Sequence, residues 1–128
     1  MTKYSKKGLE KRKADREGYA EFFQKHAQVI RSEQKCCEEC GNRLQGEVSE
    51  IAHIVPKNLF KSIATEDRNV LYMCGRFSEN QCHSKYDESK LEVIEEMKIF
   101  PLVVERFKEL EEKITEKIPY KVYERFGQ

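Results

Sequence analysis

The sequence predicts a small α+β domain whose elements follow the order helix, strand, strand, helix, helix. Apolar residues recur at helical spacing towards both ends of the chain, and two short β-favouring runs lie between them without any internal repeat. At 128 residues the chain is long enough for one domain and too short for two of ordinary size. We therefore expect a ββα core flanked by longer helices, within a single domain over residues 14–128.

The first helix is predicted over residues 14–33, because apolar positions there recur every three or four residues and so share one face. His26 lies on this face, where we expect a hydrogen-bonded core or boundary histidine. Residues 1–13 precede the helix as a basic leader, and residues 1–16 carry seven Lys or Arg against two acids. The leader is interpreted either as a phosphate-binding arm or as a solvated tail.

Two strands are predicted in the middle of the chain. The stretch EVSEIAHIV at residues 47–55 is rich in β-branched side chains, and Pro56 ends it because proline cannot donate a ladder hydrogen bond. A loop follows, and the apolar run NVLYMC at residues 69–74 forms the second predicted strand.

Two helices are predicted in the second half of the chain. The first begins near residue 82 and keeps apolar side chains on one side as far as Met97. The second begins near Pro101, carries an apolar face as far as Ile118 and is stopped by Pro119. This face packs either on the core or on a second copy of the chain, so a monomer and a homodimer both remain open.

Composition bears on compartment and on how the fold is stabilised. Charged residues make up 37% of the chain and hydrophobic residues 38%, so we expect a small core that needs a disulfide or a metal. No apolar run approaches the roughly 20 residues of a membrane span, and no secretory signal is evident. We therefore expect a cytoplasmic protein without a membrane partner, in which five cysteines favour metal ligation over disulfides.

Four of the cysteines predict a structural zinc site. Cys37 and Cys40 are separated by two residues and followed by a glycine, which is the spacing of a zinc knuckle. Cys74 and Cys82 form the second pair, on either side of a loop. Four thiolates close a tetrahedral site without an open position, so this zinc is expected to be structural. Cys36 is left over, although it could ligate with Cys40 in place of Cys37.

Two histidines suit a hydrolytic site. Cleavage of a phosphodiester needs an activated water, neutralisation of charge on phosphorus, and help for the leaving oxygen. A neutral histidine suits the first task because its ordinary pKa lies near working pH. A divalent cation suits the other two. His53 at the end of a predicted strand and His83 at the start of a predicted helix offer such a base and a metal ligand.

The motifs CEECG, EIAHIVPK, NVLYMC and CHSKYD, in this order, resemble the HNH endonuclease family with its ββα-metal fold. The resemblance covers residues 36–90 and leaves residues 91–128 as a C-terminal helical extension. It implies a DNA endonuclease that contains a structural Zn²⁺, uses Mg²⁺ or Mn²⁺ for catalysis, and leaves 5′-phosphate and 3′-hydroxyl ends.

The resemblance also implies roles for individual residues. His53 corresponds to the general base, His83 to a metal ligand on the helix, and Asn69 to an asparagine that fixes the loop carrying the base. Asp87 lies four residues after His83 and shares its helix face. It is interpreted either as a second metal ligand or as a first-turn carboxylate favoured by the helix dipole.

The chain departs from the family at Ala52, where many HNH sequences have an Asp or His that binds the metal. Either His83, Asp87, water and the substrate phosphate hold the ion, or Glu50 substitutes from the same strand face. Three basic residues in or beside the motifs are candidate nucleic-acid contacts: Lys57, Arg76 and Lys85.

A non-catalytic zinc module that binds nucleic acid or a protein partner is the second interpretation. Ala52 and the basic leader are compatible with it, whereas such a module has no need of His53 or of His83. A third interpretation keeps the enzyme and changes its substrate to branched DNA or to RNA.

Overall fold

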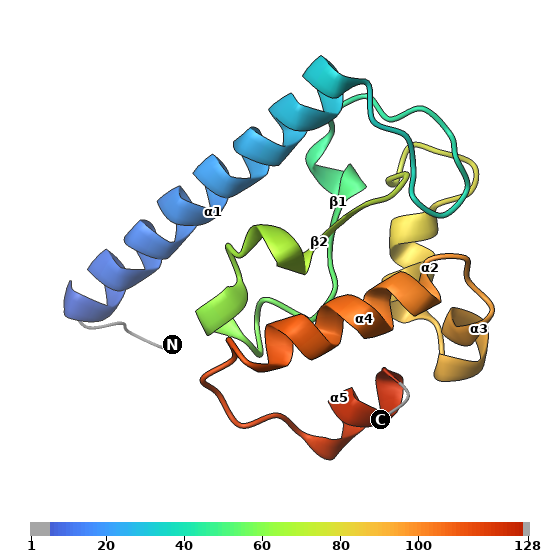
Figure 1. Cartoon of the computed structure of the whole chain (residues 1–128). Coiled ribbons are helices and arrows are strands. Elements are labelled where there is room, and N and C mark those ends of the chain that lie inside the picture. The colour runs from blue at the N-terminus through green and yellow to red at the C-terminus, as the bar shows by residue number, and fades with distance from the viewer. Residues whose placement is uncertain (1–5, 127–128) are drawn as a thin grey trace.

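The computed structural model describes the backbone of residues 6–126 and the side chains of residues 18–126 (Figure 1). The described helices and strands are α1 (Lys6–Glu33), β1 (Ile51–His53), β2 (Val70–Tyr72), α2 (Cys82–Glu88), α3 (Leu91–Glu95), α4 (Phe100–Glu111) and α5 (Tyr120–Arg125). Helices and an antiparallel sheet occur in one chain, which confirms the α+β class. An HNH fold remains a prediction.

The two strands pair antiparallel, with Ile51 opposite Tyr72 and His53 opposite Val70. Both are shorter than predicted. The stretch that begins at residue 47 first forms a 3₁₀ turn over Val48–Glu50, because the Glu50 side chain is hydrogen-bonded to the backbone before it. The strand begins only after that turn.

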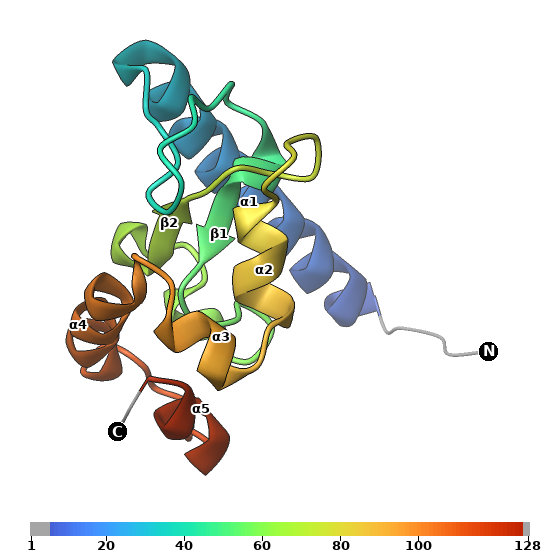
Figure 2. The ribbon, with the colours of Figure 1, turned by 90° about the vertical axis from the view of Figure 1, so that its right-hand side faces the viewer.

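The core lies between helices on both sides of this hairpin. α1 runs along one side of the two strands and α2 along the other (Figures 1 and 2). Each layer contributes large buried side chains: Ile30 from α1 is 0% exposed, Leu71 from β2 is 0% exposed, and Tyr86 from α2 is 1% exposed. The sheet is therefore the middle layer of a small three-layer core.

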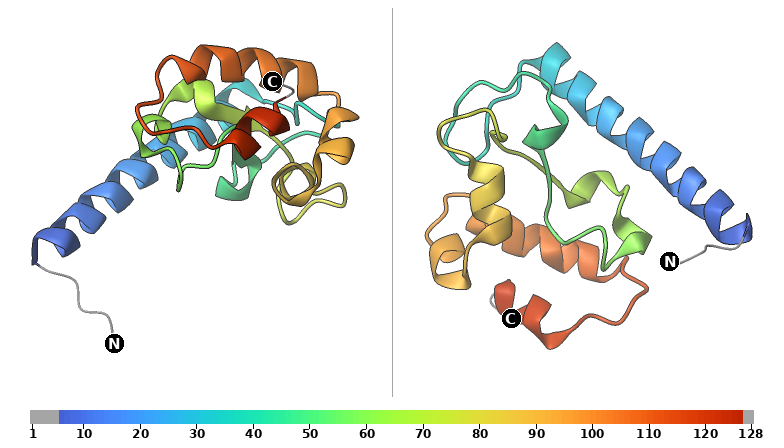
Figure 3. Two further views of the ribbon diagram at one scale, coloured as in Figure 1. Left: turned by 90° about the horizontal axis from the view of Figure 1, so that it is seen from below. Right: turned by 180° about the vertical axis from the view of Figure 1, so that it is seen from behind.

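α1 begins at Lys6, well before the predicted start near residue 14. Much of the predicted leader is thus helical, and this half of α1 extends away from the other elements (Figure 3). The side chains of residues 1–17 lie outside the described residues, so a phosphate-binding role for the leader remains a prediction. Within the described part of the chain, no helix combines the length and apolarity that a membrane span requires.

His26 on α1 is a buried, fully bonded histidine, which confirms the expectation for it. It is 6% exposed. Its Nδ1 lies 2.7 Å from the Tyr72 hydroxyl, and its Nε2 lies 2.9 Å from a carboxylate oxygen of Asp67. The ring joins α1 to β2 and to the turn before β2.

The helix predicted from residue 82 to Met97 is divided in two. Ser89 and Lys90 adopt extended backbone between α2 and α3. The apolar residues after this break still reach the core, since Ile94 is 1% and Met97 3% exposed. The periodic pattern therefore identified the buried residues but not the bend.

α4 begins near the predicted residue, at Phe100, but ends at Glu111 rather than at Pro119. The chain leaves the helix because Ser62 binds the segment that follows: its backbone N–H donates to a Glu116 carboxylate oxygen at 2.9 Å, and its Oγ accepts the Thr115 N–H at 3.2 Å.

A further helix, α5, begins directly after Pro119, and the sequence did not predict it. α5 packs back on α4. The ring of Phe126 stacks on the ring of Phe107, with centroids 4.3 Å apart and an interplanar angle of 14°. This contact between residues distant in the sequence fixes the end of the described chain against the core.

Candidate functional site

Four cysteine side chains gather where the loop after α1 meets the loop before α2. The Sγ atoms of Cys37, Cys40, Cys74 and Cys82 all lie within 4.8 Å of one another, and those of Cys40 and Cys74 are 3.7 Å apart. Zn–S bonds of about 2.3 Å place tetrahedral neighbours about 3.8 Å apart. The cluster can therefore hold a metal ion such as zinc. Cys36 is exposed and lies outside it, so Cys37 is the partner of Cys40.

The backbone around the cluster folds to present the sulfur atoms. Gly41 has a φ of +82°, in the left-handed region that glycine adopts without strain, and its N–H donates to the Cys37 carbonyl at 2.9 Å. The Cys40 N–H lies 3.4 Å from the Cys37 Sγ, and the Cys82 N–H lies 3.3 Å from the Cys74 Sγ. Both amide dipoles point at sulfur and so favour thiolates there.

The pKa values of the cluster differ from one thiol to the next. Burial acts to raise the pKa of Cys40, but hydrogen bonds from Asn80 and from the Asn42 backbone outweigh it and lower the pKa to about 7. Burial and the neighbouring Cys74 thiol raise the pKa of Cys82. Adjacent thiolates repel one another, so all four can ionise together only around a cation.

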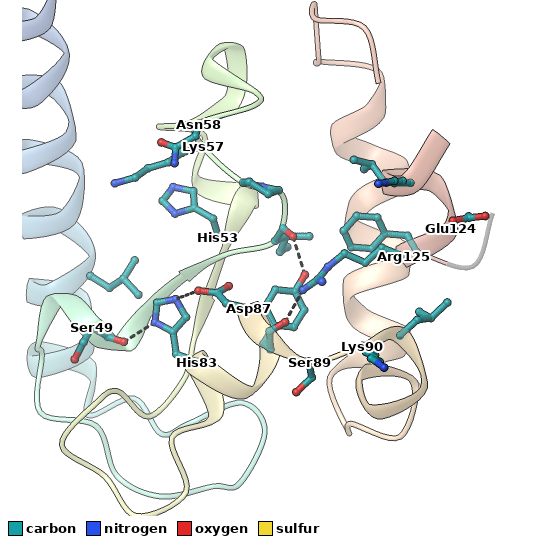
Figure 4. A pocket seen from close by; sticks show the side chains of 18 of the residues that line it. Ser49, His53, Lys57, Asn58, His83, Asp87, Ser89, Lys90, Glu124 and Arg125 are labelled. Atoms are coloured by element: carbon teal, nitrogen blue, oxygen red, sulfur yellow. Dashed lines mark hydrogen bonds and ion pairs between the residues drawn. The ribbon is translucent and has the colours of Figure 1, made fainter. Parts of the chain in front are cut away.

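A cavity of about 920 Å³ brings together residues from α1, β1, α2 and α5 (Figure 4). His53, His83 and Asp87 all line it, so the structure places the predicted base and both predicted ligands of a catalytic ion around one cleft. We call this cavity the histidine cleft.

His53 enters the cleft from the end of β1. Its Nε2 donates to the Ala64 carbonyl at 2.8 Å, which leaves the lone pair on Nδ1. The ring packs against Phe22 and Phe23, with centroids 5.8 Å away in both cases. Burial lowers the pKa of His53, the Ala64 bond opposes this, and the Lys57 charge adds to the lowering. His53 is therefore a neutral imidazole at neutral pH.

His83 and Asp87 form a pair on α2. The His83 Nδ1 donates to the Ser49 carbonyl at 2.6 Å, and its Nε2 lies 3.0 Å from a carboxylate oxygen of Asp87. Burial acts to lower the pKa of His83, but the bonds to Asp87 and to Ser49 outweigh it and raise the pKa. Ligands at about 2.1 Å from an octahedral Mg²⁺ lie about 3.0 Å apart in adjacent positions. The pair therefore fits two adjacent ligands of such an ion.

The alternative role of Asp87 as a first-turn carboxylate is wrong. α2 runs from Cys82 to Glu88 and has no acid in its first turn. Asp87 stands near its C-terminal end, where the helix dipole disfavours negative charge. Its contact is instead with His83, on the same face of α2.

Asn69 is fully buried and ties together the loop between the strands. Its Oδ1 accepts the Val55 N–H at 2.9 Å, and its Nδ2 donates to the carbonyls of Val55 at 3.2 Å and Ile63 at 3.3 Å. The loop thus held includes Ala64, whose carbonyl binds His53. Asn69 is therefore placed to position the base through the loop.

Tyr86 and the cysteine cluster fix α2 relative to β1. The Tyr86 hydroxyl donates to the Ile54 carbonyl at 2.7 Å, one residue after His53. At the other end of α2, the His83 N–H donates to the Cys74 carbonyl at 3.2 Å. These contacts hold the two histidines on opposite elements at a fixed separation.

Glu50 does not replace the ligand that is missing at Ala52. It is 6% exposed, and its carboxylate accepts the backbone N–H groups of Gln45, Gly46 and Glu47 at 2.7 to 3.1 Å. It also lies in the 3₁₀ turn before β1, so the expectation that it shares a strand face with Ala52 is wrong. Its bonds close the loop between the cysteine knuckle and the sheet.

The predicted nucleic-acid contacts divide between two places. Lys57 lines the cleft, with its Nζ 4.8 Å from the centroid of the Phe23 ring. Arg76 and Lys85 are exposed and are not among the residues that line it. Sequence reasoning missed three cations that do line it: Lys90, Lys121 and Arg125. They follow the last of the nuclease-like motifs, so no local signal identified them.

Comparisons with known proteins identify no relative of this chain. No family model matches the chain, and no curated protein or solved structure matches it significantly. The cysteine cluster and the histidine cleft are therefore the features from which we infer a function.

Proposed function

We propose that this chain is a zinc-stabilised, divalent-metal-dependent endonuclease of the HNH type that hydrolyses DNA phosphodiester bonds. The observation that carries the proposal is the shared cleft of His53 and the His83–Asp87 pair. A base with an available lone pair thus faces the same cavity as two ligands at metal-binding separation. The order of β1, β2 and α2 along the chain agrees with the resemblance to that family.

His53 acts as the general base. The Ala64 carbonyl holds the proton of Nε2, so Nδ1 is the atom that takes a proton from the attacking water. The lowered pKa of His53 keeps the ring neutral and ready to accept that proton. The same carbonyl then stabilises the imidazolium, because it accepts a stronger hydrogen bond from a charged ring.

His83 and Asp87 are the residues that would hold Mg²⁺ or Mn²⁺. The bond from Nδ1 to the Ser49 carbonyl fixes the His83 ring, so Nε2, which lies beside Asp87, is the nitrogen that would bind the ion. With two protein ligands, water and a substrate phosphate would complete the coordination, as is usual for Mg²⁺. The bound ion supplies charge neutralisation on the phosphate and at the leaving oxygen.

The second candidate is a zinc module without catalysis. Ala52, which is 0% exposed and has no ligand atom in its side chain, favours it. The cleft then binds an anionic partner without cleaving it. The two candidates differ in whether the cleft hydrolyses DNA.

The test is cleavage of supercoiled plasmid in Mg²⁺ or Mn²⁺ by the unaltered protein, His53→Ala and Asn58→Ala. Asn58 lines the same cleft and has no titratable group, so it is the matched control. We expect nicked or linear product from the protein and from Asn58→Ala, and at least about 100-fold less from His53→Ala. Folded, zinc-loaded protein that cuts nothing would contradict the proposal and favour the non-catalytic module.

A further inference from the structure

We infer that the histidine cleft accepts an unpaired DNA strand, with a base in its apolar part and neighbouring phosphates on the lysines at its rim. This inference rests on the proposed function and narrows its substrate. It is carried by α5, which lies outside the region that resembles a nuclease.

Elements from both ends of the chain flank the cleft. α1 contributes Phe23 to its lining, and the C-terminal segment contributes Val122 from α5 and Phe126 directly after it. In Figure 4, the side chains of His83 and Asp87 lie between α1 and α5. Pro56 and Leu91 add further apolar lining. Phe23, Pro56 and Leu91 keep accessible apolar surface, so the histidines stand in a hollow whose accessible lining suits the face of a nucleobase.

α5 is a fixed part of the fold. The Arg125 guanidinium donates to the Tyr86 carbonyl at 2.5 Å and lies 4.8 Å from the centroid of the Tyr86 ring. Phe126 is 1% exposed in its stack on Phe107, and Val122 is 9% exposed. These contacts join α5 to α2 and α4 and bury Val122 and Phe126, so α5 supports the cleft from behind and presents Lys121 at its rim.

The charge of the cleft suits a polyanion. Histidines aside, the described charged residues that line it are four cations and two acids: Lys57, Lys90, Lys121, Arg125, Asp87 and Glu124. The side chains of Lys90 and Lys121 are exposed, and neither forms an ion pair with a described residue. They are free to bind the phosphates on either side of the one that is cleaved.

An unpaired strand fits this shape better than a duplex. B-form DNA stacks its bases inside and presents its grooves to elements that protrude from a protein. Here His53, His83 and Asp87 lie within a hollow, and its apolar lining can contact the face of a base that is unstacked. Enzymes that act inside such pockets take a single strand or extrude a nucleotide from the duplex.

The test is binding of a labelled oligo(dT) of about 12 nucleotides, compared with a hairpin duplex of matched length, by fluorescence anisotropy without added Mg²⁺. We expect the single strand to bind at least about tenfold more tightly. Equal or tighter binding of the duplex would overturn the inference. Tighter binding of an oligo(rU) of the same length would overturn the choice of DNA.

Variants then locate the binding surface. Lys90→Ala/Lys121→Ala removes two expected phosphate contacts. The slope of log K against log salt concentration should therefore become less negative by about 1.4. Lys108→Ala/Lys117→Ala is the matched control, since both lysines are exposed and lie outside the cleft. Equal slopes for the two double variants would overturn the inference.

Adding Mg²⁺ separates this inference from the proposed function. A preference for the single strand without any cleavage contradicts the nuclease and leaves the strand preference standing. Equal cleavage of the single strand and the duplex supports the nuclease and overturns the strand preference.

Discussion

The cysteine cluster, which can hold a metal ion, and the histidine cleft, where we propose a second one, have different surroundings. In the cluster, Cys37, Cys74 and Cys82 are at most 3% exposed. In the cleft, the side chains of His83 and Asp87 are 23% and 52% exposed. Cys40 is the one exposed member of the cluster. A set of four thiolate ligands leaves no position for a substrate, whereas a pair beside a cavity leaves several. The difference supports the proposal that the cluster stabilises the fold and that the cleft carries the chemistry.

Loss of a cluster ligand should give the largest effect. Cys40→Ser should remove zinc, about one ion per chain, and lower the melting temperature by more than about 10 °C, because zinc binding is coupled to folding. Metal analysis and calorimetry measure both. Cys36→Ser is the control and should change neither, since Cys36 lies outside the cluster. Equal effects of Cys40→Ser and Cys36→Ser would contradict a structural zinc in the cluster.

Loss of a cleft ligand should change activity without changing stability. In Asp87→Asn, the Mg²⁺ concentration for half-maximal cleavage should rise by about 10- to 100-fold, because a neutral amide is the weaker ligand. Glu88→Gln makes the same chemical change one residue later, outside the cleft, and should leave the Mg²⁺ dependence unaltered. An unchanged requirement in Asp87→Asn would leave Asp87 as only the ion-pair partner of His83.

The pH dependence should give the smallest effect. The neutral form of His53 is the base, so cleavage at saturating Mg²⁺ should fall as pH falls through the pKa of His53, which lies below the ordinary 6.5. In Lys57→Gln this acid limb should move slightly to higher pH, because the Lys57 charge is a lesser cause of the lowered pKa. A limb centred above pH 6.5 in the unaltered protein would contradict the assignment of His53.

Sequence patterns predicted the parts of the fold that depend on neighbouring residues. The apolar face of α1, the two strands and the start of α2 all follow local periodicity. The end of α4 and the whole of α5 do not. They depend on Ser62 binding Glu116 and on Phe126 stacking on Phe107, contacts across large sequence separations that no window of neighbouring residues contains.

The residues of the candidate sites also divide into those that local sequence patterns predicted and those that depend on distant contacts. Spacing predicted the four cysteines, which the fold brings together, and adjacency to a cysteine singled out His83. The prediction that Glu50 shares a strand face with Ala52 failed. The Glu50 carboxylate accepts hydrogen bonds from the backbone before it, and this residue therefore belongs to a 3₁₀ turn rather than to the strand. Lys121 reaches the cleft only through the packing of α5, so its place could not be predicted from sequence.

One peptide bond separates Cys82, a member of the cysteine cluster, from His83, which lines the histidine cleft. A protein engineer who wished to transplant the cleft onto another scaffold would therefore have to carry the cysteines with it. Conversely, a library that varied exposed residues of the cleft, such as Lys90 and Lys121, would leave this two-residue junction untouched. The cysteine cluster and the histidine cleft would therefore have to be transplanted as one unit that includes this junction.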